Sequence, residues 1–331
     1  MEWTRGPTIG RGSSATVSAA ISHGTGEAFA VKSAELSKSG LLQREQRILS
    51  SLDSPRVVGY VGFDITEENN RQMYNLFMEY VDGGTLADEI RRHGGRMEEP
   101  AVAFYTGQIV KGLEYIHSIG VAHCDIKARN ILIGGGGAKI ADFGCAKRVS
   151  GGVDDLAAAG IGGTPMFMAP EVAVGEEQGC AADIWAVGCS AIEMATGGSP
   201  WPVVGDPVSL LYRIGFSGES PEVPDFLSGE GKDFLSKCLR RDPKERWTAK
   251  ELLKHPFLAE SDSIQKQLPD FNSTSPTSVL LDHGVWNSLE EPETQKTRQN
   301  SPEKRVEQLA SSSPVPDWRW DENWITVRRH N

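Results

Sequence analysis

The sequence predicts an α+β fold in which a small β-rich part, residues 3–80, precedes a larger helical part, residues 81–258. Two observations predict this order. Short apolar runs separated by turn residues fill most of the first 80 residues, and apolar residues recur at helical spacing from residue 100 onward. Near residue 259 the composition changes to Ser, Pro, Gln, Asn and charged residues, which predicts a largely disordered tail over residues 259–331.

The β-rich part is predicted to contain strands and one helix. The strands are expected at residues 3–9, 16–20, 28–32, 57–63 and 73–78. A helix interrupts them between residues 41 and 52, where Leu42, Ile48, Leu49 and Leu52 recur at helical spacing.

The helical part is predicted to begin with a long helix at residues 100–119. Pro100 is favourable in a first helical turn, and Val102, Ile109 and Leu113 lie on one face of such a helix. Further helices are expected at residues 181–196, 231–239 and 248–253, and the folded domain is expected to end near Leu258.

Composition and charge exclude several classes of protein. The 331 residues carry a net charge of -11, which argues against binding to nucleic acid or to an anionic membrane, since both need a clustered basic surface. No run of 18 apolar residues occurs, and residues 1–5 do not resemble a signal peptide. The five cysteines show no CxxC spacing, so neither a disulfide framework nor a zinc site is predicted. We therefore expect a protein of the cytoplasm or the nucleus.

A glycine-rich segment, residues 10–17, lies between two of the predicted strands. Gly10 and Gly12 would let backbone amides approach a bound phosphate. Such turns are also common in ordinary hairpins, and Ala15 stands where a third glycine of a phosphate-binding loop would be. A dinucleotide-binding fold is excluded because a strand, not a helix, follows. Alone, the segment is weak evidence for nucleotide binding.

Lys32 ends an apolar strand, where its ammonium group could neutralise the α- and β-phosphates of a nucleotide. Glu45 follows on the predicted helix and could hold Lys32 extended by pairing with it. The alternatives are an ordinary lysine at a sheet edge and a glutamate on a solvated helix face.

The most informative motif is the stretch 123–130, HCDIKARN, which is followed by the triplet Asp-Phe-Gly at residues 142–144. Its spacing suits phosphoryl transfer. Asp125 would orient the attacking hydroxyl or accept its proton, and Lys127 would lie against the transferred γ-phosphoryl group. Asn130 and Asp142 would hold Mg²⁺, which prefers oxygen ligands.

With these motifs in this order, the chain resembles the eukaryotic protein kinase family over residues 3–258. Residues 169–171, Ala-Pro-Glu, are similar to the end of that family's activation segment, and residues 183–188 are similar to its large-lobe core helix. Arg246 is similar to the arginine that pairs with the glutamate of Ala-Pro-Glu. The resemblance implies a bilobal protein kinase fold with a small N-lobe and a larger helical C-lobe.

The resemblance also implies how ATP binds. A hinge at residues 78–81 would meet adenine, with Met78 as gatekeeper and the backbone of Glu79 and Val81 as partners. The implied nucleotide-binding residues are Ile9, Gly10, Arg11, Gly12, Ser13, Ser14, Ala15, Thr16, Val17, Ala30, Lys32, Met78, Glu79 and Val81.

Two residues favour a serine/threonine kinase over a tyrosine kinase. Tyrosine kinases usually carry Ala-Ala-Arg-Asn where this chain has Lys127 to Asn130. Lys127, together with Thr164, resembles serine/threonine kinases, whose threonine supports the catalytic aspartate.

A narrower resemblance is to plant MAP kinase kinase kinases of the MEKK-like group. It rests on residues 3–6, on the glycine-rich segment 10–17 and on residues 163–171. It implies that the substrates are MAP kinase kinases, phosphorylated on serine or threonine, in stress or hormone signalling that includes abscisic acid.

Cys124 departs from the family pattern, because most members have an arginine that repels the catalytic centre until a phosphate neutralises it. Between Gly144 and Thr164 the only hydroxyl side chain is that of Ser150. We therefore hypothesise that catalysis does not depend on phosphorylation of the activation segment. Asp154 and Asp155 are expected to be solvated loop carboxylates, although they could supply negative charge.

The remaining cysteines and His123 are expected to have structural roles. Cys145, beside Asp-Phe-Gly, could be a redox-sensitive thiol near the ATP site, but a small packed residue is the default interpretation. His123 is expected to pack as scaffold, since Asp125 already fills the role of base.

Two features of the tail suggest regulation. Ser275, Ser301 and Ser313 each precede a proline and are minimal proline-directed phosphorylation sites, although composition alone produces this motif. Trp318, Trp320 and Trp324 lie within seven residues, and a polar tail rarely keeps large apolar rings without burying them. They could dock a partner or fold back onto the kinase domain.

Two alternatives stay open. A catalytically inactive pseudokinase scaffold would be under no demand to keep the complete set of catalytic residues, which this chain has. A cytosolic serine/threonine kinase outside the MAP kinase cascade is the alternative within the family, and the stretch 163–168 counts against it.

Overall fold

The structure is a computed structural model of the chain, and it describes residues 1–12, 14–149, 162–202 and 206–259. Several residues named above lie outside these ranges: Ser13, Ser150, Asp154, Asp155, Ser275, Ser301, Ser313, Trp318, Trp320 and Trp324.

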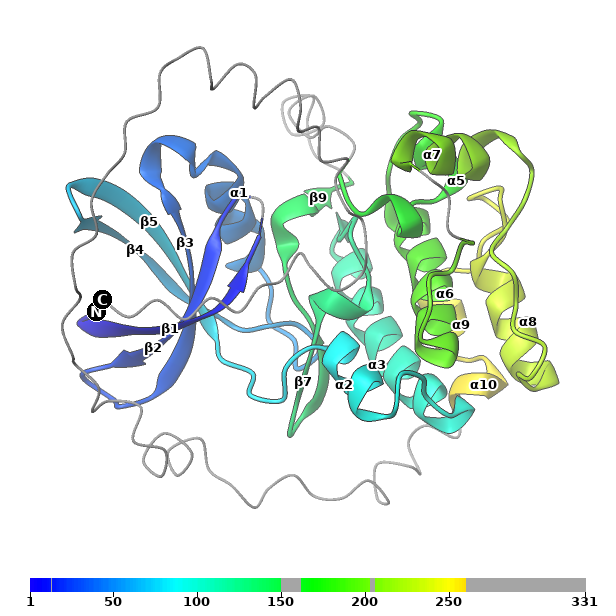
Figure 1. The fold of residues 1–331 in the computed structure, drawn as a ribbon, viewed down its shortest axis with the longest axis horizontal. Helices are drawn as coiled ribbons and strands as arrows, with labels where there is room; N and C mark the ends of the chain where they lie inside the picture. Colours follow the sequence, from blue (N-terminus) through cyan, green and yellow to red (C-terminus); the bar gives the residue numbers. More distant parts are fainter. Residues whose placement is uncertain (13, 150–161, 203–205, 260–331) are drawn as a thin grey trace, which may run out of the picture.

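The N-lobe is a five-stranded antiparallel sheet with one helix on one of its faces (Figure 1). The strand order is β1-β2-β3-β5-β4, so β1 and β4 are the edges. The strands are β1 (Trp3–Arg11), β2 (Thr16–Ser22), β3 (Ala28–Glu35), β4 (Tyr60–Glu68) and β5 (Arg71–Glu79). On one face of the sheet the rings of Trp3, Phe29 and Phe77 meet edge to face. Helix α1 (Gly40–Leu49) packs on the other face through Leu42, Ile48 and Leu49.

The fourth strand begins later than predicted. Val57 and Val58, which were expected in this strand, bond instead to Ile140 of the C-lobe, the Val58 amide donating to the Ile140 carbonyl at 2.9 Å. The apolar run was therefore read correctly as extended backbone, but its partner is in the other lobe. The length of an apolar run does not indicate which strand it pairs with.

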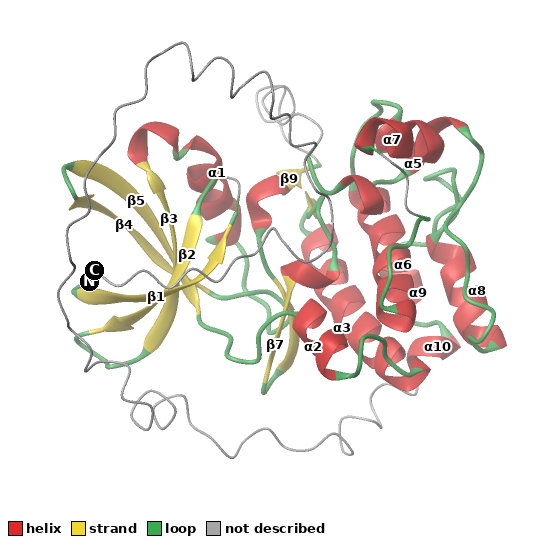
Figure 2. Cartoon of the chain, viewed as in Figure 1, coloured by secondary structure: helices red, strands yellow, loops and turns green. Residues whose placement is uncertain are grey.

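The C-lobe is mostly helical (Figure 2). Its helices are α2 (Leu86–Arg92), α3 (Glu99–Ser118), α5 (Pro170–Ala173), α6 (Cys180–Thr196), α7 (Pro207–Phe216), α8 (Gly229–Cys238), α9 (Ala249–Leu252) and α10 (Pro256–Ala259). Four short strands lie near the junction of the lobes: β6 (Val121–Ala122), β7 (Ile131–Gly134), β8 (Gly137–Ile140) and β9 (Lys147–Arg148). None of the helices in the described ranges is long and apolar enough to span a membrane.

Four C-lobe helices, α2, α5, α7 and α10, were not predicted from the sequence, and α5 and α10 have only four residues each. Helix α2 starts at a capping box in which the Thr85 side chain accepts from the Asp88 amide and the Asp88 side chain accepts from the Thr85 amide. Helix α7 starts at Asp206, whose carboxylate caps the Ser209 amide, with Pro207 in the first turn. Both helices are short and bury few apolar side chains, so their periodicity is weak.

The predicted pair between Arg246 and Glu171 is confirmed. Arg246 Nη1 and Nη2 donate to the two Glu171 oxygens at 2.8 and 3.1 Å, and both side chains are buried. This bidentate pair fixes α5, and with it the end of the segment that leads out of the active site, to the lower C-lobe.

Candidate active site

The loop that carries the catalytic motif is anchored by one buried carboxylate of α6. Asp183 accepts the backbone amide of His123 through Oδ2 and that of Cys124 through Oδ1, both at 2.8 Å. Burial alone would raise the Asp183 pKa, but the His117 hydrogen bond and the backbone amides hold this pKa below its usual value. These bonds support Cys124 in a left-handed backbone conformation, φ 67°, which costs a non-glycine residue about 1–2 kcal/mol.

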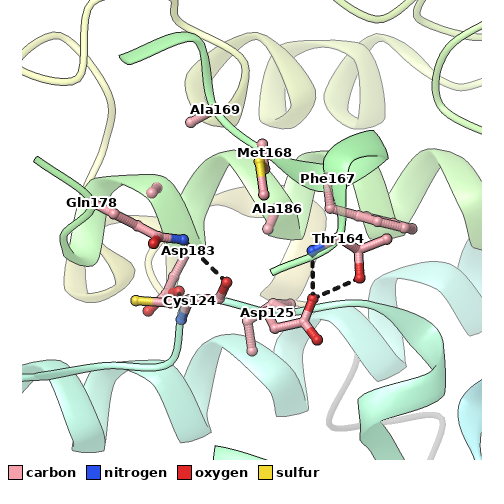
Figure 3. A pocket seen from close by; sticks show the side chains of 11 residues that line it. Cys124, Asp125, Thr164, Phe167, Met168, Ala169, Gln178, Asp183 and Ala186 are labelled. Carbon is pink, nitrogen blue, oxygen red and sulfur yellow. Dashed lines mark hydrogen bonds between the residues drawn. The ribbon is translucent and has the colours of Figure 1, made fainter. Parts of the chain in front are cut away.

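Asp125 lies in a tight network of hydrogen bonds (Figure 3). Its Oδ1 accepts from the amide and the hydroxyl of Thr164, at 3.0 and 2.8 Å. Its Oδ2 accepts from Lys127 Nζ at 2.7 Å and from Asn130 Nδ2 at 2.9 Å. Lys127 Nζ also donates to the Thr164 hydroxyl at 2.6 Å. The carboxylate is therefore held in one orientation, as a group that must align a substrate hydroxyl requires.

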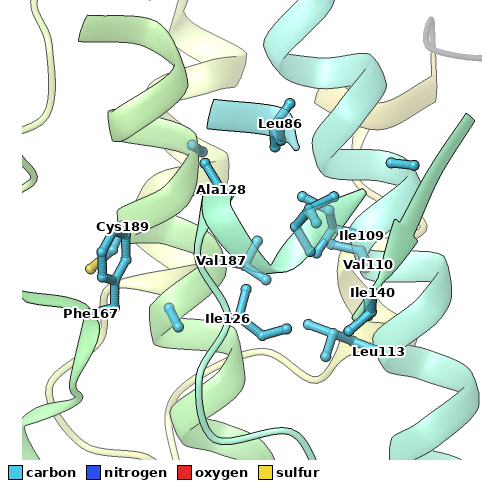
Figure 4. Packing of buried hydrophobic residues seen from close by; sticks show 14 of the residues in the cluster. Leu86, Ile109, Val110, Leu113, Ile126, Ala128, Ile140, Phe167, Val187 and Cys189 are labelled. Atoms are coloured by element: carbon cyan, nitrogen blue, oxygen red, sulfur yellow. The ribbon is translucent and has the colours of Figure 1, made fainter. Parts of the chain in front are cut away.

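The same loop is packed between α3 and α6 (Figure 4). Ile126 and Ala128 alternate with the polar catalytic residues and are fully buried. Ile126 lies close to Leu113 of α3 and Val187 of α6. Burying a side chain of this size contributes about 1.5–3 kcal/mol. The apolar core therefore fixes the loop on the side of Ile126 and Ala128, and the polar residues of the loop bond to one another.

Lys32, Glu45 and Asp142 meet at the junction of the lobes. Lys32 Nζ is 2.9 and 2.7 Å from the Glu45 oxygens and 2.8 Å from Asp142 Oδ1. Burial alone would lower the Lys32 pKa, but the two carboxylates outweigh it and raise this pKa. Burial would raise the Asp142 pKa, yet the adjacent Lys32 charge lowers it to about 2. Lys32 is therefore a fixed cation and Asp142 a fixed anion at physiological pH.

The β7–β8 hairpin places Asn130 beside Asp142. Ile131 pairs with Ile140 across the hairpin, and the Ala141 amide donates to the Asn130 carbonyl at 2.9 Å, so Asn130 lies next to the start of Asp-Phe-Gly. The Asn130 Nδ2 bonds point to Asp125, which leaves Oδ1 available, and the bonds of Asp142 use Oδ1, which leaves Oδ2. An amide oxygen and an ionised carboxylate fit a hard divalent cation.

Most of the implied nucleotide-binding residues lie on β1, β2, β3 and β5 of the N-lobe sheet or in the loops next to these strands. Gly10 pairs with Val17 and Arg11 with Thr16 across the β1–β2 hairpin, and the Gly12 amide donates to the Ala15 carbonyl at 2.9 Å. Ala30 of β3 lies opposite Met78 of β5. The backbone after Met78 continues through Glu79 to Val81 and links the lobes.

Glu79 has a role that the sequence did not reveal. Its carboxylate accepts from Lys139 Nζ of β8 at 2.6 and 2.8 Å and from the Gly59 amide at 2.9 Å. The side chain thus ties the segment between the lobes to the C-lobe, so the expected contact with adenine would fall to the backbone of Glu79.

The cysteines near the site are not activated thiols. Burial raises the pKa of Cys124, and the charge of Asp183 adds to that shift. Burial, together with the nearby Asp125 and Asp142, raises the pKa of Cys145 to about 11. A redox-sensitive thiol needs a lowered pKa, so neither residue fits that role, and Cys145 fits the packed role that was its default interpretation.

Gln178 joins the catalytic loop to the segment that ends in Thr164, and no sequence signal pointed to it. Its Nε2 donates to the carbonyls of Cys124 at 3.1 Å and of Gly162 at 3.0 Å, and its Oε1 accepts from the Gly162 amide at 3.4 Å. It lines a small cavity of about 10 Å³, near the size of one water, together with Cys124 and Asp125 (Figure 3).

A glycine is required at position 163 because the segment that ends in Thr164 passes close to the backbone of Cys124. Its φ is +110°, and a Cβ at this position would lie 2.5 Å from the Cys124 carbonyl oxygen. Only glycine lets the two backbone segments approach so closely.

Comparison with known proteins agrees with this geometry. A family described as the protein kinase domain matches residues 3–258. Mitogen-activated protein kinase kinase kinase 17 of Arabidopsis thaliana is 55% identical over 297 residues, which cover 88% of this chain and 78% of that protein. Mitogen-activated protein kinase kinase kinase 18 of the same plant is 50% identical over 349 aligned positions and the full length of both chains. Mitogen-activated protein kinase kinase kinase 20 is 41% identical over 99% of this chain and all of that protein. The chain therefore belongs to the protein kinase family, and within it to the serine/threonine kinases of the group that contains these plant MAP kinase kinase kinases.

Proposed function

We propose that this serine/threonine protein kinase uses ATP and Mg²⁺ to phosphorylate MAP kinase kinases. The observation that supports this most is the closed network of Asp125, Lys127 and Thr164, in which the base, the phosphate-facing cation and the threonine of the serine/threonine type are joined at 2.6–2.8 Å. The names of the similar plant proteins support the class of substrate.

In the proposed mechanism each residue has one task. Asp125 aligns the substrate hydroxyl and accepts its proton as the phosphoryl group is transferred. Lys127 lies beside Asp125 and offsets negative charge on the transferred group. Lys32, held by Glu45, positions the α- and β-phosphates. Asn130 Oδ1 and Asp142 would hold Mg²⁺, which when bound shields the phosphate charges from one another.

We also propose that catalysis does not require phosphorylation of the activation segment. A cysteine carries no positive charge that a phosphate would have to neutralise, and burial raises the pKa of Cys124, so its thiol stays neutral. The neutral amide of Gln178 instead joins the catalytic loop to Gly162. Treating the purified protein with phosphatase should leave its activity nearly unchanged. Loss of nearly all activity, restored by a phosphomimetic at Ser150 or Thr164, would contradict the proposal.

An in vitro assay against a panel of MAP kinase kinases tests the main proposal. Each substrate should carry an inactivating substitution of its own so that only this chain transfers phosphate. The wild-type chain should phosphorylate at least one member on serine or threonine, and Asp125→Asn should not. Phosphorylation of a generic substrate but of no panel member would favour a kinase outside the cascade.

A second measurement separates an enzyme from a pseudokinase scaffold. The wild-type chain should turn over ATP when Mg²⁺ is supplied, and Asp142→Asn should abolish this turnover because it removes the negative charge beside Lys32. A chain that binds panel members without any turnover would be a scaffold.

The same resemblance supports a place in plant stress or hormone signalling, abscisic acid included, in the cytoplasm or the nucleus. The test is the activity of the tagged kinase recovered from plant cells before and after treatment with abscisic acid, together with its distribution between the two compartments. Equal activity under both conditions would remove abscisic acid from the proposal.

A further inference from the structure

The outer edge of the N-lobe sheet carries an uncovered apolar face. Phe63 and Ile65 of β4 are 52% and 49% exposed, although both are large and apolar. The Phe63 ring stacks on Tyr74 of β5 at 5.5 Å between centroids, and Ile65 pairs directly with Tyr74. Tyr74 belongs to the core under α1, so Phe63 and Ile65 extend that core to the surface beside the helix. We name these two residues the β4 face.

The β4 face lies on an open sheet edge. Within the described ranges β4 pairs only with β5, at the end of the strand order. An open edge with exposed apolar side chains is a template for another extended segment.

Helix α1 packs against β5, the strand of Tyr74, and carries an arginine without an ion pair. Burial raises the pKa of Tyr74, Tyr60 adds to this shift, and the positive charge of Arg47 opposes part of it. Arg47 is exposed, and in the part of the chain that the structure describes it forms no ion pair; its Nε donates to the Gln43 carbonyl at 3.4 Å. Glu67 continues the exposed side of β4, so an incoming carboxylate is expected toward Arg47 rather than toward Glu67.

The chain itself contains a segment with matching periodicity. Residues 317–324 read Asp-Trp-Arg-Trp-Asp-Glu-Asn-Trp. The three tryptophans, at 318, 320 and 324, follow one another at steps of two and four positions. Successive side chains of an extended strand point to opposite faces, so all three rings would share one face. Glu322 would share it too, and is the complement of Arg47. Phe63 and Ile65 have the same two-residue spacing.

We propose that residues 317–324 of this chain bind in extended form along the outer edge of β4, with tryptophans covering the β4 face and Glu322 pairing with Arg47. The 57 residues from 260 to 316 connect this segment to α10. Fully extended they would reach about 190 Å, so the connection permits binding at any face of the domain.

A second exposed apolar surface, on α7, fits the segment less well. Val208, Tyr212 and Phe216 are 75%, 66% and 64% exposed and are spaced four residues apart, which matches a helix rather than a strand. The helix is flanked by the carboxylates of Asp206 and Glu219, the latter paired with Arg213, so it offers no free cation to an acidic segment. The α7 surface therefore serves as the matched control.

The test measures binding of a labelled peptide, residues 315–327, by fluorescence anisotropy. The receptor is the full chain with Trp318→Ala, Trp320→Ala and Trp324→Ala, which would leave the β4 face free. The peptide should bind this receptor and bind the wild-type chain about tenfold more weakly, because the tethered segment competes for the same edge. Absence of binding to the receptor would overturn the proposal.

Substitutions on the receptor then locate the site. Phe63→Asp with Ile65→Asp should weaken binding about tenfold or more, whereas Tyr212→Asp with Phe216→Asp should leave it unchanged. The reverse pattern would assign the segment to α7 and refute the β4 site. Arg47→Glu, which removes no core contact, should also weaken binding and remains informative if the double β4 variant unfolds.

A peptide with residues 319 and 320 exchanged keeps the composition but breaks the even spacing of the tryptophans, and it should bind about tenfold more weakly. Equal binding of the two peptides would refute the extended form.

Hydrogen exchange of the full chain distinguishes binding within one chain from binding between copies. Amides of β4 should exchange faster in the triple tryptophan variant than in the wild type, by the same ratio at low and high protein concentration. A ratio that grows with concentration would show that a second copy is the occupant and would overturn the assignment to the same chain.

Discussion

The side-chain amide of Gln178 bridges the catalytic loop and the segment that ends in Thr164, and substituting it tests whether this bridge supports catalysis. Gln178→Ala removes the donor shared by the carbonyls of Cys124 and Gly162. Leaving buried polar groups without partners costs about 1–3 kcal/mol. The bridge positions the segment that ends in Thr164, and Thr164 orients Asp125. Part of the lost free energy should therefore reduce the stabilisation of the transition state. A loss of about 1.4 kcal/mol in the transition state corresponds to a tenfold fall in kcat.

The assay is the initial rate of phosphorylation of an inactive MAP kinase kinase, measured against ATP concentration and alongside thermal unfolding. Gln178→Ala should lower kcat about tenfold and leave the KM for ATP unchanged, because Lys32 and Glu45 are not touched by the bridge. Gln178→Glu should be worse, since a carboxylate cannot donate to two carbonyls. The control is Gln46→Ala in the other lobe. It removes one hydrogen bond of 3.0 Å from a side-chain amide to the Tyr60 hydroxyl and should leave kcat unchanged. A normal kcat with a lowered Tm in Gln178→Ala would show that the bridge only stabilises the fold and would refute the reasoning.

Three further predictions follow from the geometry around the site. Gly163→Ala should lower both kcat and Tm, because its Cβ would lie 2.5 Å from a backbone oxygen, whereas Gly229→Ala, with nothing within 4 Å, should change neither; equal effects would contradict the steric argument. Arg246→Ala should reduce the free energy of unfolding by about 3–5 kcal/mol in urea titrations, since it leaves the buried charge of Glu171 unpaired, and a loss below about 1 kcal/mol would contradict this. Burial raises the pKa of Glu193 to about 7, so the stability linked to its protonation is complete below about pH 4.5 and is lost as the pH rises through 7. Glu193→Gln should therefore gain Tm relative to the wild type between pH 5 and pH 8, and a constant difference would refute the linkage.

The catalytic motif could be found in the sequence because the chemistry expected of it needs its residues in a short, ordered pattern. Asp125, Lys127 and Asn130 lie within six residues, and the hairpin that returns to Asp142 leaves little freedom in where that carboxylate can be. The structure places Lys127 and Asn130 against Asp125, and Asp142 against Lys32. The strands of the N-lobe and the longer helices were also predictable from their apolar patterns, although β1 and β4 fully bury none of their residues and β4 begins three residues later than predicted.

The residues that were missed act through tertiary neighbours and have no local pattern. Gln178 lies in a polar run, residues 176–179, that reads as a loop, and its role exists only because α6 brings it under the catalytic loop. Helix α7 was missed because three of its large apolar residues face outward, which spreads the apolar positions around the helix and hides its period. Glu79 was expected to contribute only its backbone, and nothing in its surroundings along the chain indicated Lys139 as a partner.

Cys124 connects the sequence argument to the structural one. In the family pattern an arginine at this position needs a negative partner, so the loop depends on a charge that a phosphate must supply. Here the backbone of Cys124 is left-handed, Asp183 holds it through the amides of His123 and Cys124, and the side chain is a buried neutral thiol. The link to the following segment comes from the carbonyl of Cys124 through Gln178, a contact between neutral groups that salt and phosphatase do not alter. If this link carries the active form, the activity of the phosphatase-treated enzyme should fall with Gln178→Ala and should be insensitive to ionic strength up to the point where substrate binding weakens. A strong loss of kcat at saturating substrate in moderate salt would instead indicate that an ion pair, and not the amide bridge, holds the loop.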